Sequence, residues 1–394
     1  MRQHLSNAVN SRFPRLSWDI WGASRTIRQA RPSETLPALV NARQRWAKTP
    51  VAPISAEPRL LLVVPMADHA EIPWLPAEGN YSFELFETAK ACLGAERVDT
   101  LRIDPHQTTA EYHRTIIDRL IDGQFTHVLC RIDIESNGGP HWSWDEFVRL
   151  LRREWSGVFL PLTYDSAYPY ISMHLDRVTR LHHRAMPIVL DRPISRVIRP
   201  HRPAAGPLFL PLSDASTHAI DQALEGVEPD LDLTFIGNVT GYPYRAQLLE
   251  HLEDAGLNIT VNPQGRSHDA MPGFTSYAHA LRRSKVTLNF TRCNGVPVTQ
   301  LKTRMLEGSL FGAVVASDNA LYARDYFVEG EEFISYRDPQ DLKEQLTSLL
   351  ADDERLSAMR ERAHAKADVL RVRNFWEATD RALRQRSMPP ILAA

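Results

Sequence analysis

Residues 235–238 have the pattern of a strand that ends at Gly237, and a loop then leads to Arg245 at the start of a helical pattern. Backbone N–H groups at a helix N-terminus and an arginine side chain are groups that hold phosphates in proteins. Gly237, Asn238 and Arg245 are therefore candidate phosphate-binding residues. The alternative for Arg245 is a structural role in the loop.

Polar residues also end the next strand-like runs. Asn289 and Thr291 close one run, and Asp318 and Asn319 follow the next. In open α/β sheets, ligands bind outside the carboxyl ends of the strands, so these positions are candidate ligand contacts. Each residue type is equally typical of a turn.

These candidates require a scaffold of parallel strands and helices. From residue 59 onward, short apolar runs alternate with helical periodicity, which is typical of parallel β-α-β units. The expected strands are 59–65, 97–103, 126–133, 157–163 and 187–190, then 233–239, 258–261, 285–291, 312–317 and 332–336. The expected helices are 82–93, 109–122, 143–155 and 171–183, then 244–255, 275–283, 301–311, 339–350 and 352–385.

The pattern predicts an α/β protein with two Rossmann-like domains that face each other across a cleft. A proline-rich stretch, 191–207, separates the two series of elements. The expected parts are a basic N-terminal extension (1–57), a first domain (58–205), a second domain (206–370) and a C-terminal helical tail (371–394).

Composition and motifs exclude several classes of protein. The 394 residues include 46 Lys and Arg against 48 Asp and Glu, which argues against a surface built throughout for nucleic acid. There is no P-loop, no GxGxxG after the first strand and no HExxH. We therefore expect no P-loop ATPase, no dinucleotide cofactor and no bound metal.

The lengths of the apolar runs predict the cellular location of the protein. The longest, Leu60–Ala67, is much shorter than the ~20 residues of a membrane-spanning helix, and the N-terminus lacks the apolar region of a signal peptide. We expect a cytoplasmic protein without a membrane span, and a peripheral position at a membrane is the alternative.

The second series of elements resembles the C-terminal domain of GT-B glycosyltransferases, specifically the group similar to spore maturation protein CgeB. The likeness covers roughly residues 206–370, and the first domain matches in architecture alone. It rests on Lys302-x-Arg304-x-x-Glu307-x-x-x-x-Gly312, followed by Phe327-x-x-Gly330 and Tyr336-x-Asp338.

This resemblance implies a metal-independent transferase with a nucleotide-diphosphate sugar, of the UDP-binding type, as donor. Glu307 would bond the donor ribose, and Lys302 and Arg304 would lie near the diphosphate. The chemistry is reasonable, because a carboxylate accepts two hydroxyls and cations at a helix N-terminus offset the charge of a leaving diphosphate. Many retaining relatives carry a second glutamate where this chain has Thr299, so the stereochemical outcome stays open.

The acceptor would approach from the first domain, where an inverting transfer needs a base. Candidates at predicted strand ends are Asp68 and His69, then Asp133 and Glu135, and finally Asp165. We favour Asp165 or Asp68 as the catalytic base.

Two basic segments could bind an anionic acceptor, such as a lipid-linked phosphate, a polysaccharide or a nucleic acid. Residues 1–50 contain nine Lys and Arg against two acids, and residues 177–202 contain seven arginines. The alternative is that these arginines pair with acidic groups or form a solvated face.

Two other functions are compatible with the same architecture. One is a sugar-nucleotide epimerase, and the other is a non-catalytic protein that binds nucleotides or polyanions. The sequence by itself identifies neither the donor sugar and nucleotide, nor the acceptor, nor the oligomeric state.

Overall fold

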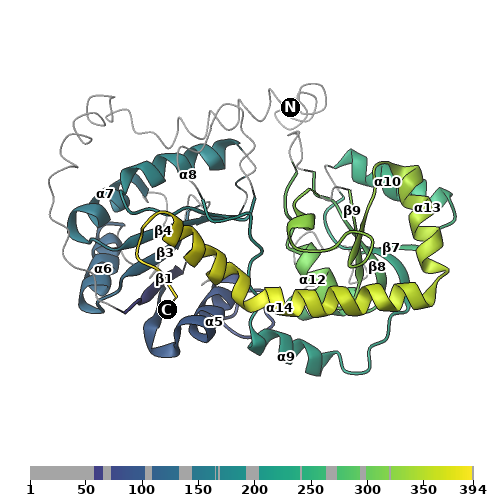
Figure 1. The fold of residues 1–394 in the computed structure, drawn as a ribbon, viewed down its shortest axis with the longest axis horizontal. Coiled ribbons are helices and arrows are strands. Elements are labelled where there is room, and N and C mark those ends of the chain that lie inside the picture. Colours follow the sequence, from purple (N-terminus) through teal and green to yellow (C-terminus); the bar gives the residue numbers. More distant parts are fainter. Residues whose placement is uncertain are drawn as a thin grey trace.

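The computed structural model describes residues 57–64, 72–102, 109–132, 144–164, 166, 169–191, 204–239, 242–262, 273–292, 299–318 and 321–392. They form two α/β domains side by side, each built on a parallel sheet (Figure 1). This arrangement confirms the predicted class of two Rossmann-like domains.

The N-terminal sheet has the strand order β2-β1-β3-β4-β5, and every pairing in it is parallel. Its strands are β1 (Leu60–Val64), β2 (Val98–Arg102), β3 (His127–Arg131), β4 (Val158–Thr163) and β5 (Ile188–Val189). The first strand along the chain is central, with Leu60 aligned to Val98 on one side and to His127 on the other.

Both faces of this sheet are buried, as the continuous apolar strands require. Leu61 and Val63 belong to the core beneath α6 (Thr109–Asp122), α7 (Trp144–Glu154) and α8 (Pro169–Leu181). Leu60, Leu62 and Val64 belong to the opposite core, beneath α5 (Tyr81–Leu93). The alternation follows from the two-residue period of a strand.

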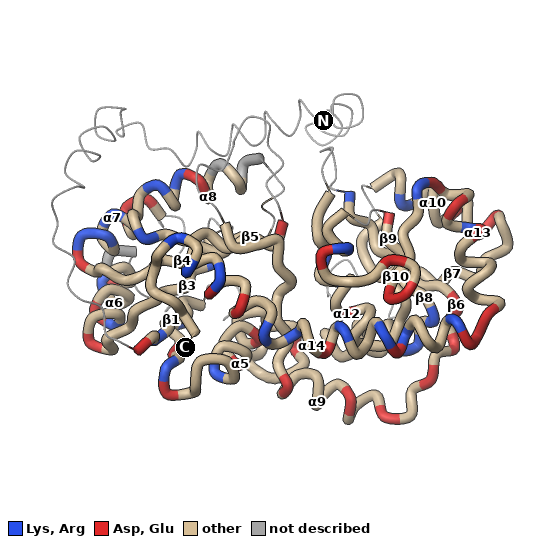
Figure 2. Tube along the Cα trace, in the orientation of Figure 1, with Lys and Arg blue, Asp and Glu red and all other residues tan. Residues whose placement is uncertain are grey.

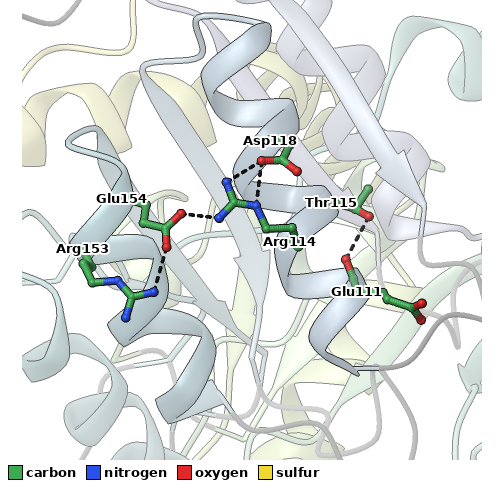
Figure 3. Close-up of polar contacts among 6 residues, drawn as sticks. All are labelled: Glu111, Arg114, Thr115, Asp118, Arg153 and Glu154. Carbon is green, nitrogen blue, oxygen red and sulfur yellow. Dashed lines mark hydrogen bonds and ion pairs between the residues drawn. The ribbon is translucent and has the colours of Figure 1, made fainter.

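The outer surfaces of α6 and α7 are joined by ion pairs (Figure 3). Arg114 donates to Asp118 at 2.6 Å within α6 and also to Glu154 at the end of α7, which Arg153 contacts at 2.8 Å. These groups are mostly exposed, and such pairs add little stability, ~0–1 kcal/mol. They neutralise one another's charge on this side of the domain.

The C-terminal sheet has the strand order β10-β9-β8-β6-β7, again entirely parallel. Its strands are β6 (Leu231–Phe235), β7 (Ile259–Val261), β8 (Ser284–Asn289), β9 (Val314–Ser317) and β10 (Phe333–Ser335). Its helices are α9 (Asp214–Ala223), α10 (Pro243–Asp254), α11 (Phe274–Arg282), α12 (Arg304–Leu310) and α13 (Pro339–Leu350). Read from β7, the order repeats that of the N-terminal sheet.

One long helix, α14 (Asp353–Gln385), crosses from the C-terminal domain to the N-terminal domain (Figure 1). Leu356 and Met359 pack in the C-terminal core, whereas Phe375 and Trp376 pack in the N-terminal core. The helix is continuous across residues 370 and 371, where we predicted a domain boundary. The predicted domain limits stay predictions.

Some elements differ from their predicted limits. Helix α9 was not expected; its N-cap, Ser213, is held by Glu84 of α5, whose carboxylate accepts from the Ser213 N–H at 2.7 Å. Helix α12 begins at Arg304 and not at residue 301, because Gln300 and Leu301 are hydrogen-bonded to Asp191 of the other domain. The described part of the chain contains no helix that is both long and apolar enough to cross a membrane.

Candidate functional site

The candidate donor-binding residues gather at the switch point of the C-terminal sheet. Strands β6 and β8 are neighbours there, and the chain leaves β6 toward β7 on one side and β8 toward β9 on the other. Gly237 follows β6 and Asn289 ends β8. A switch point is where open α/β sheets bind ligands, because the loops diverge and leave a crevice.

Gly237 holds the turn after β6 in a fixed position. Its N–H donates to Asn262 Oδ1 at 2.7 Å, and Asn262 Nδ2 donates to its carbonyl oxygen at 2.9 Å. A Cβ at this position would lie 3.1 Å from the Phe235 ring and 3.3 Å from Arg304 Nη2, so glycine lets the guanidinium approach the backbone closely.

Arg304, the first residue of α12, places a positive charge at this turn. Its Nη2 donates to the carbonyl of Ile236, and its Cζ lies 5.6 Å from the centre of the Phe235 ring. Figure 2 locates α12 within the C-terminal domain, where it contacts α14 and strands β8 and β9. A cation fixed beside a glycine turn is suited to a phosphate.

Glu307 lies one turn further along α12, and its side chain is almost completely buried. The Tyr277 hydroxyl on α11 donates to Glu307 Oε2 at 2.8 Å. Burial raises the pKa of Glu307 above its ordinary value, while the Tyr277 hydrogen bond and the Arg304 charge act in the opposite direction. A carboxylate in this setting can accept hydrogen bonds from the hydroxyls of a bound sugar or ribose.

A small pocket lies at the N-terminal end of α12, with Lys302 and Met305 in its lining. Its lining comes from the ends of β8 and β9, from the segment before α12 and from the segment after β9: Thr291, Thr299, Gln300, Leu301, Lys302, Met305, Ser317, Tyr322 and Ala323. Lys302 stands two residues before α12, in the extended segment and not on the helix. The pocket thus combines one ammonium group with hydroxyl and amide groups.

Residues of the N-terminal domain approach the same place. Arg131 ends β3, and its Cζ lies 3.9 Å from the centre of the Tyr164 ring after β4. Tyr81, the first residue of α5, packs edge-on against Tyr164 with a centroid distance of 5.8 Å. Burial, and to a lesser extent the charge of Glu307, raise the pKa of Tyr81 above its ordinary value.

Arg245, in the first turn of α10, is bonded to Asn238 in the loop after β6. Arg245 Nη1 donates to the Asn238 carbonyl at 2.8 Å, and its Cζ lies 3.7 Å from the centre of the Tyr242 ring. These bonds give Arg245 a structural role in the loop after β6. Its role in donor binding, and that of Asn238, stay predictions.

Asn289, Thr291 and Asp318 lie together at the ends of β8 and β9. Asn289 is fully buried and donates to Ser317 Oγ at 3.2 Å, while its Oδ1 accepts no hydrogen bond from the described residues. Asp318 Oδ1 accepts from the Thr291 N–H at 2.7 Å and from its hydroxyl at 2.6 Å. These bonds fix the loop that leaves β8.

Several predicted residues lie outside the described part of the chain. They include the candidate bases and the basic extension: Asp68, His69, Asp133, Glu135, Asp165, Asn319 and residues 1–50. In the segment 177–202, the described Arg177 and Arg180 contact Asp145 at 3.3 Å and Asp176 at 2.6 Å. Pairing with acids, the alternative stated above, accounts for these two arginines.

The sequence did not indicate Tyr277, Tyr81, Gln300 or Asp191 as site residues. Tyr277 could be placed on a helix, but no local pattern showed that this helix would face Glu307. Tyr81 and Asp191 come from the other domain, and only the packing of the two domains brings them near.

Comparison with known proteins agrees with this geometry. Residues 218–382 match the model of a family described as glycosyl transferase-like. Anabaena HepE in complex with UDP and glucose superposes with a TM-score of 0.52 at 9% identity, covering 84% of this chain and all of HepE. An alpha-glucosyltransferase in complex with UDP and a 13-mer DNA superposes with a TM-score of 0.50 at 10% identity, covering 84% of this chain and 99% of that protein.

At this identity the likeness concerns the fold, which is GT-B. None of the curated protein sequences matches the chain significantly.

Proposed function

We propose that the protein is a glycosyltransferase that transfers a sugar from a nucleotide-diphosphate sugar, with UDP as the nucleotide. The observation that carries the proposal is the grouping of Arg304, Lys302 and Glu307 at the switch point of the domain that matches the glycosyl transferase-like family. Both solved structures named above are complexes with UDP, which supports the choice of nucleotide.

Each group has a distinct task in the proposed reaction. Glu307 accepts the two ribose hydroxyls, and Tyr277 keeps its carboxylate oriented. Arg304 and Lys302, with the backbone at Gly237, hold the diphosphate and offset the negative charge that grows on it as the sugar–phosphate bond breaks. Asn289 is proposed as a further donor contact.

The test is release of UDP from a panel of UDP-sugars, together with binding of UDP measured by calorimetry. We expect slow donor hydrolysis by the wild-type chain and a loss of at least about tenfold in UDP affinity for Glu307→Ala and for Arg304→Ala. The matched controls are Glu253→Ala and Arg337→Ala, which remove exposed side chains distant from the site in sequence. Equal losses in the controls, or no UDP binding by the wild type, would reject the proposal.

The same assay separates the other two functions. Turnover of a free UDP-sugar to its C2 epimer would identify an epimerase, and tight binding without turnover of any donor would identify a binding protein. Membership of the narrower CgeB-like group is part of the proposal. So is independence from a metal or cofactor, which predicts equal rates with and without EDTA.

The acceptor side is proposed from the sequence. Asp165 or Asp68 is the base that takes the acceptor proton, with His69 as the third candidate, and the acceptor is anionic and bound through residues 1–50 and 177–202. Asp165→Asn and Asp68→Asn should each leave UDP affinity unchanged, and the variant that removes the base should abolish transfer.

A further inference from the structure

A chain of hydrogen bonds joins the N-terminal domain to the pocket beside α12. Asp191, which follows β5, accepts through Oδ1 from the Leu301 N–H at 2.9 Å and through Oδ2 from Gln300 Nε2 at 3.0 Å. Gln300 Oε1 in turn accepts from Lys302 Nζ. Asp191 and Gln300 are each 2% exposed, so the hydrogen bonds between them are shielded from water, and Gln300 and Lys302 line the pocket.

The chemistry of these groups fixes the direction of every bond. An ionised carboxylate only accepts hydrogen bonds, so the side of the Gln300 amide that faces Asp191 must be its NH2 group. The amide oxygen must then point the other way, toward the ammonium of Lys302. The charge of Asp191 therefore determines where the positive charge of Lys302 stands.

Asp191 is itself held from within its own domain. Ser166 Oγ donates to the Asp191 carbonyl at 2.6 Å, and the Asp191 N–H donates to Ser166 Oγ at 3.3 Å. The backbone of Asp191 is thus held within the N-terminal domain, and its carboxylate bonds to the segment that lines the pocket.

We propose that Asp191 is a positioning residue for the donor: acting through Gln300, it presets the ammonium of Lys302 for the diphosphate. The inference rests on the proposed function for the identity of the ligand, but the positioning of Lys302 can be measured without any nucleotide. It assigns a role in donor binding to a residue of the domain opposite the donor site.

The first measurement follows the acylation rate of Lys302 by a soluble amine reagent, with peptide mass spectrometry as readout. Lys285, paired with Asp232 at 2.7 Å, is the internal reference. We expect Asp191→Asn to increase the rate at Lys302 about fivefold relative to Lys285, since the amide is no longer forced to present its oxygen. Gln300→Leu, which keeps the Asp191 bond to Leu301, should produce the same change.

The matched control is Asp380→Asn in α14. Asp380 is also a buried carboxylate that accepts from two backbone N–H groups, those of Ile391 and Leu392, at 2.8 and 3.0 Å. It therefore reproduces the general cost of losing such a group. An unchanged Lys302 rate in Asp191→Asn and Gln300→Leu, or an equal change in Asp380→Asn, would overturn the proposal.

The second measurement compares UDP with uridine, which lacks the diphosphate. Asp191→Asn should weaken the binding of UDP about tenfold and leave the affinity for uridine unchanged. In a Lys302→Met background it should have no further effect on UDP affinity. Equal losses for both ligands would contradict positioning through Lys302. If the wild type binds no UDP while the Lys302 rate still responds, the proposed donor is wrong and the positioning by Asp191 stands.

Discussion

Glu307 is a carboxylate that the fold takes almost entirely out of water, and this determines how it responds to pH. Burial raises its pKa above the ordinary value of 4.5, and the Tyr277 hydroxyl partly opposes the increase by donating to the ionised form. A raised carboxyl pKa means that ionisation costs the folded state. The apo protein should therefore lose stability as the pH rises through the window that begins at 4.5.

The affinity for the donor should change with pH in the opposite direction to stability, because only the ionised carboxylate accepts two ribose hydroxyls. We expect the affinity for UDP to fall as the pH is lowered through the raised pKa of Glu307. In Tyr277→Phe the pH midpoint of UDP binding should move upward by about one unit, because the ionised carboxylate loses one hydrogen bond. Calorimetric titration of UDP between pH 4.5 and 8 measures both midpoints.

The phosphates of UDP also titrate, so the control is the same series with Glu307→Gln. Subtracting its curve leaves the contribution of the carboxylate alone. If the wild type and Glu307→Gln give parallel curves, the Glu307 carboxylate does not bind the ligand.

At the scale of the element, α12 carries the site because it packs unusually close to the sheet. Gly308 follows Glu307, and a Cβ there would lie 2.8 Å from Val315 Cγ2 and 3.1 Å from Thr287 Cγ2. Both of these side chains are fully buried in the sheet. The helix therefore comes close enough for Arg304 to reach the end of β6 and for Glu307 to reach Tyr277.

Gly308→Ala should displace α12 and disturb both contacts. Overpacking of this kind costs ~1–3 kcal/mol, from which up to ~1 kcal/mol of improved helix propensity is subtracted. We expect a lower free energy of unfolding in urea together with weaker UDP binding.

Gly273→Ala is the matched variant, since a Cβ at Gly273 meets no atom within 4 Å and its φ is −51°. It should leave both quantities near their wild-type values. Wild-type UDP affinity in Gly308→Ala would show that the close approach of α12 is not needed for the site.

At the scale of the whole molecule, α14 joins the domains that together surround the site. Trp376 is fully buried against the N-terminal sheet, and its indole N–H donates to Thr88 Oγ1 at 3.0 Å. Lys and Arg are interspersed with Asp and Glu along the helix (Figure 2). Leu383 packs in the same core as Trp376, so apolar contacts attach the helix to the N-terminal domain.

Trp376→Ala should lower the free energy of unfolding by ~3–5 kcal/mol, because it leaves a large cavity and removes the hydrogen bond that Thr88 Oγ1 accepts from the indole. Chemical denaturation measures the loss. Val369→Ala, on the same helix but 72% exposed, should change it by less than ~0.5 kcal/mol. Should Trp376→Ala fail to fold, Trp376→Phe keeps an aromatic ring and should show a smaller loss; a wild-type value in that variant would contradict the packing described.

The sequence by itself determined the elements and their class. Apolar runs with flanking helical periodicity are local signals, so all ten predicted strands correspond to strands of the two parallel sheets, and the N-cap of α13 at Asp338 follows from its own side chain. Motif order also indicated the domain that holds Arg304 and Glu307. Helix α9 was missed although its N-cap is local, with Ser213 Oγ accepting from the Ser216 N–H at 3.2 Å; Glu84, more than a hundred residues earlier, adds a bond to the Ser213 N–H.

Only the tertiary structure decided which side chains complete the site. Tyr277 bonds to Glu307 from a neighbouring helix, and Asp191 bonds to the pocket-lining segment from the other domain. Such contacts depend on how two sheets and their helices pack, and packing sums many weak interactions between residues far apart in the chain. No local spacing encodes that sum, which is why the sequence placed the charges of the site but not the groups that hold them.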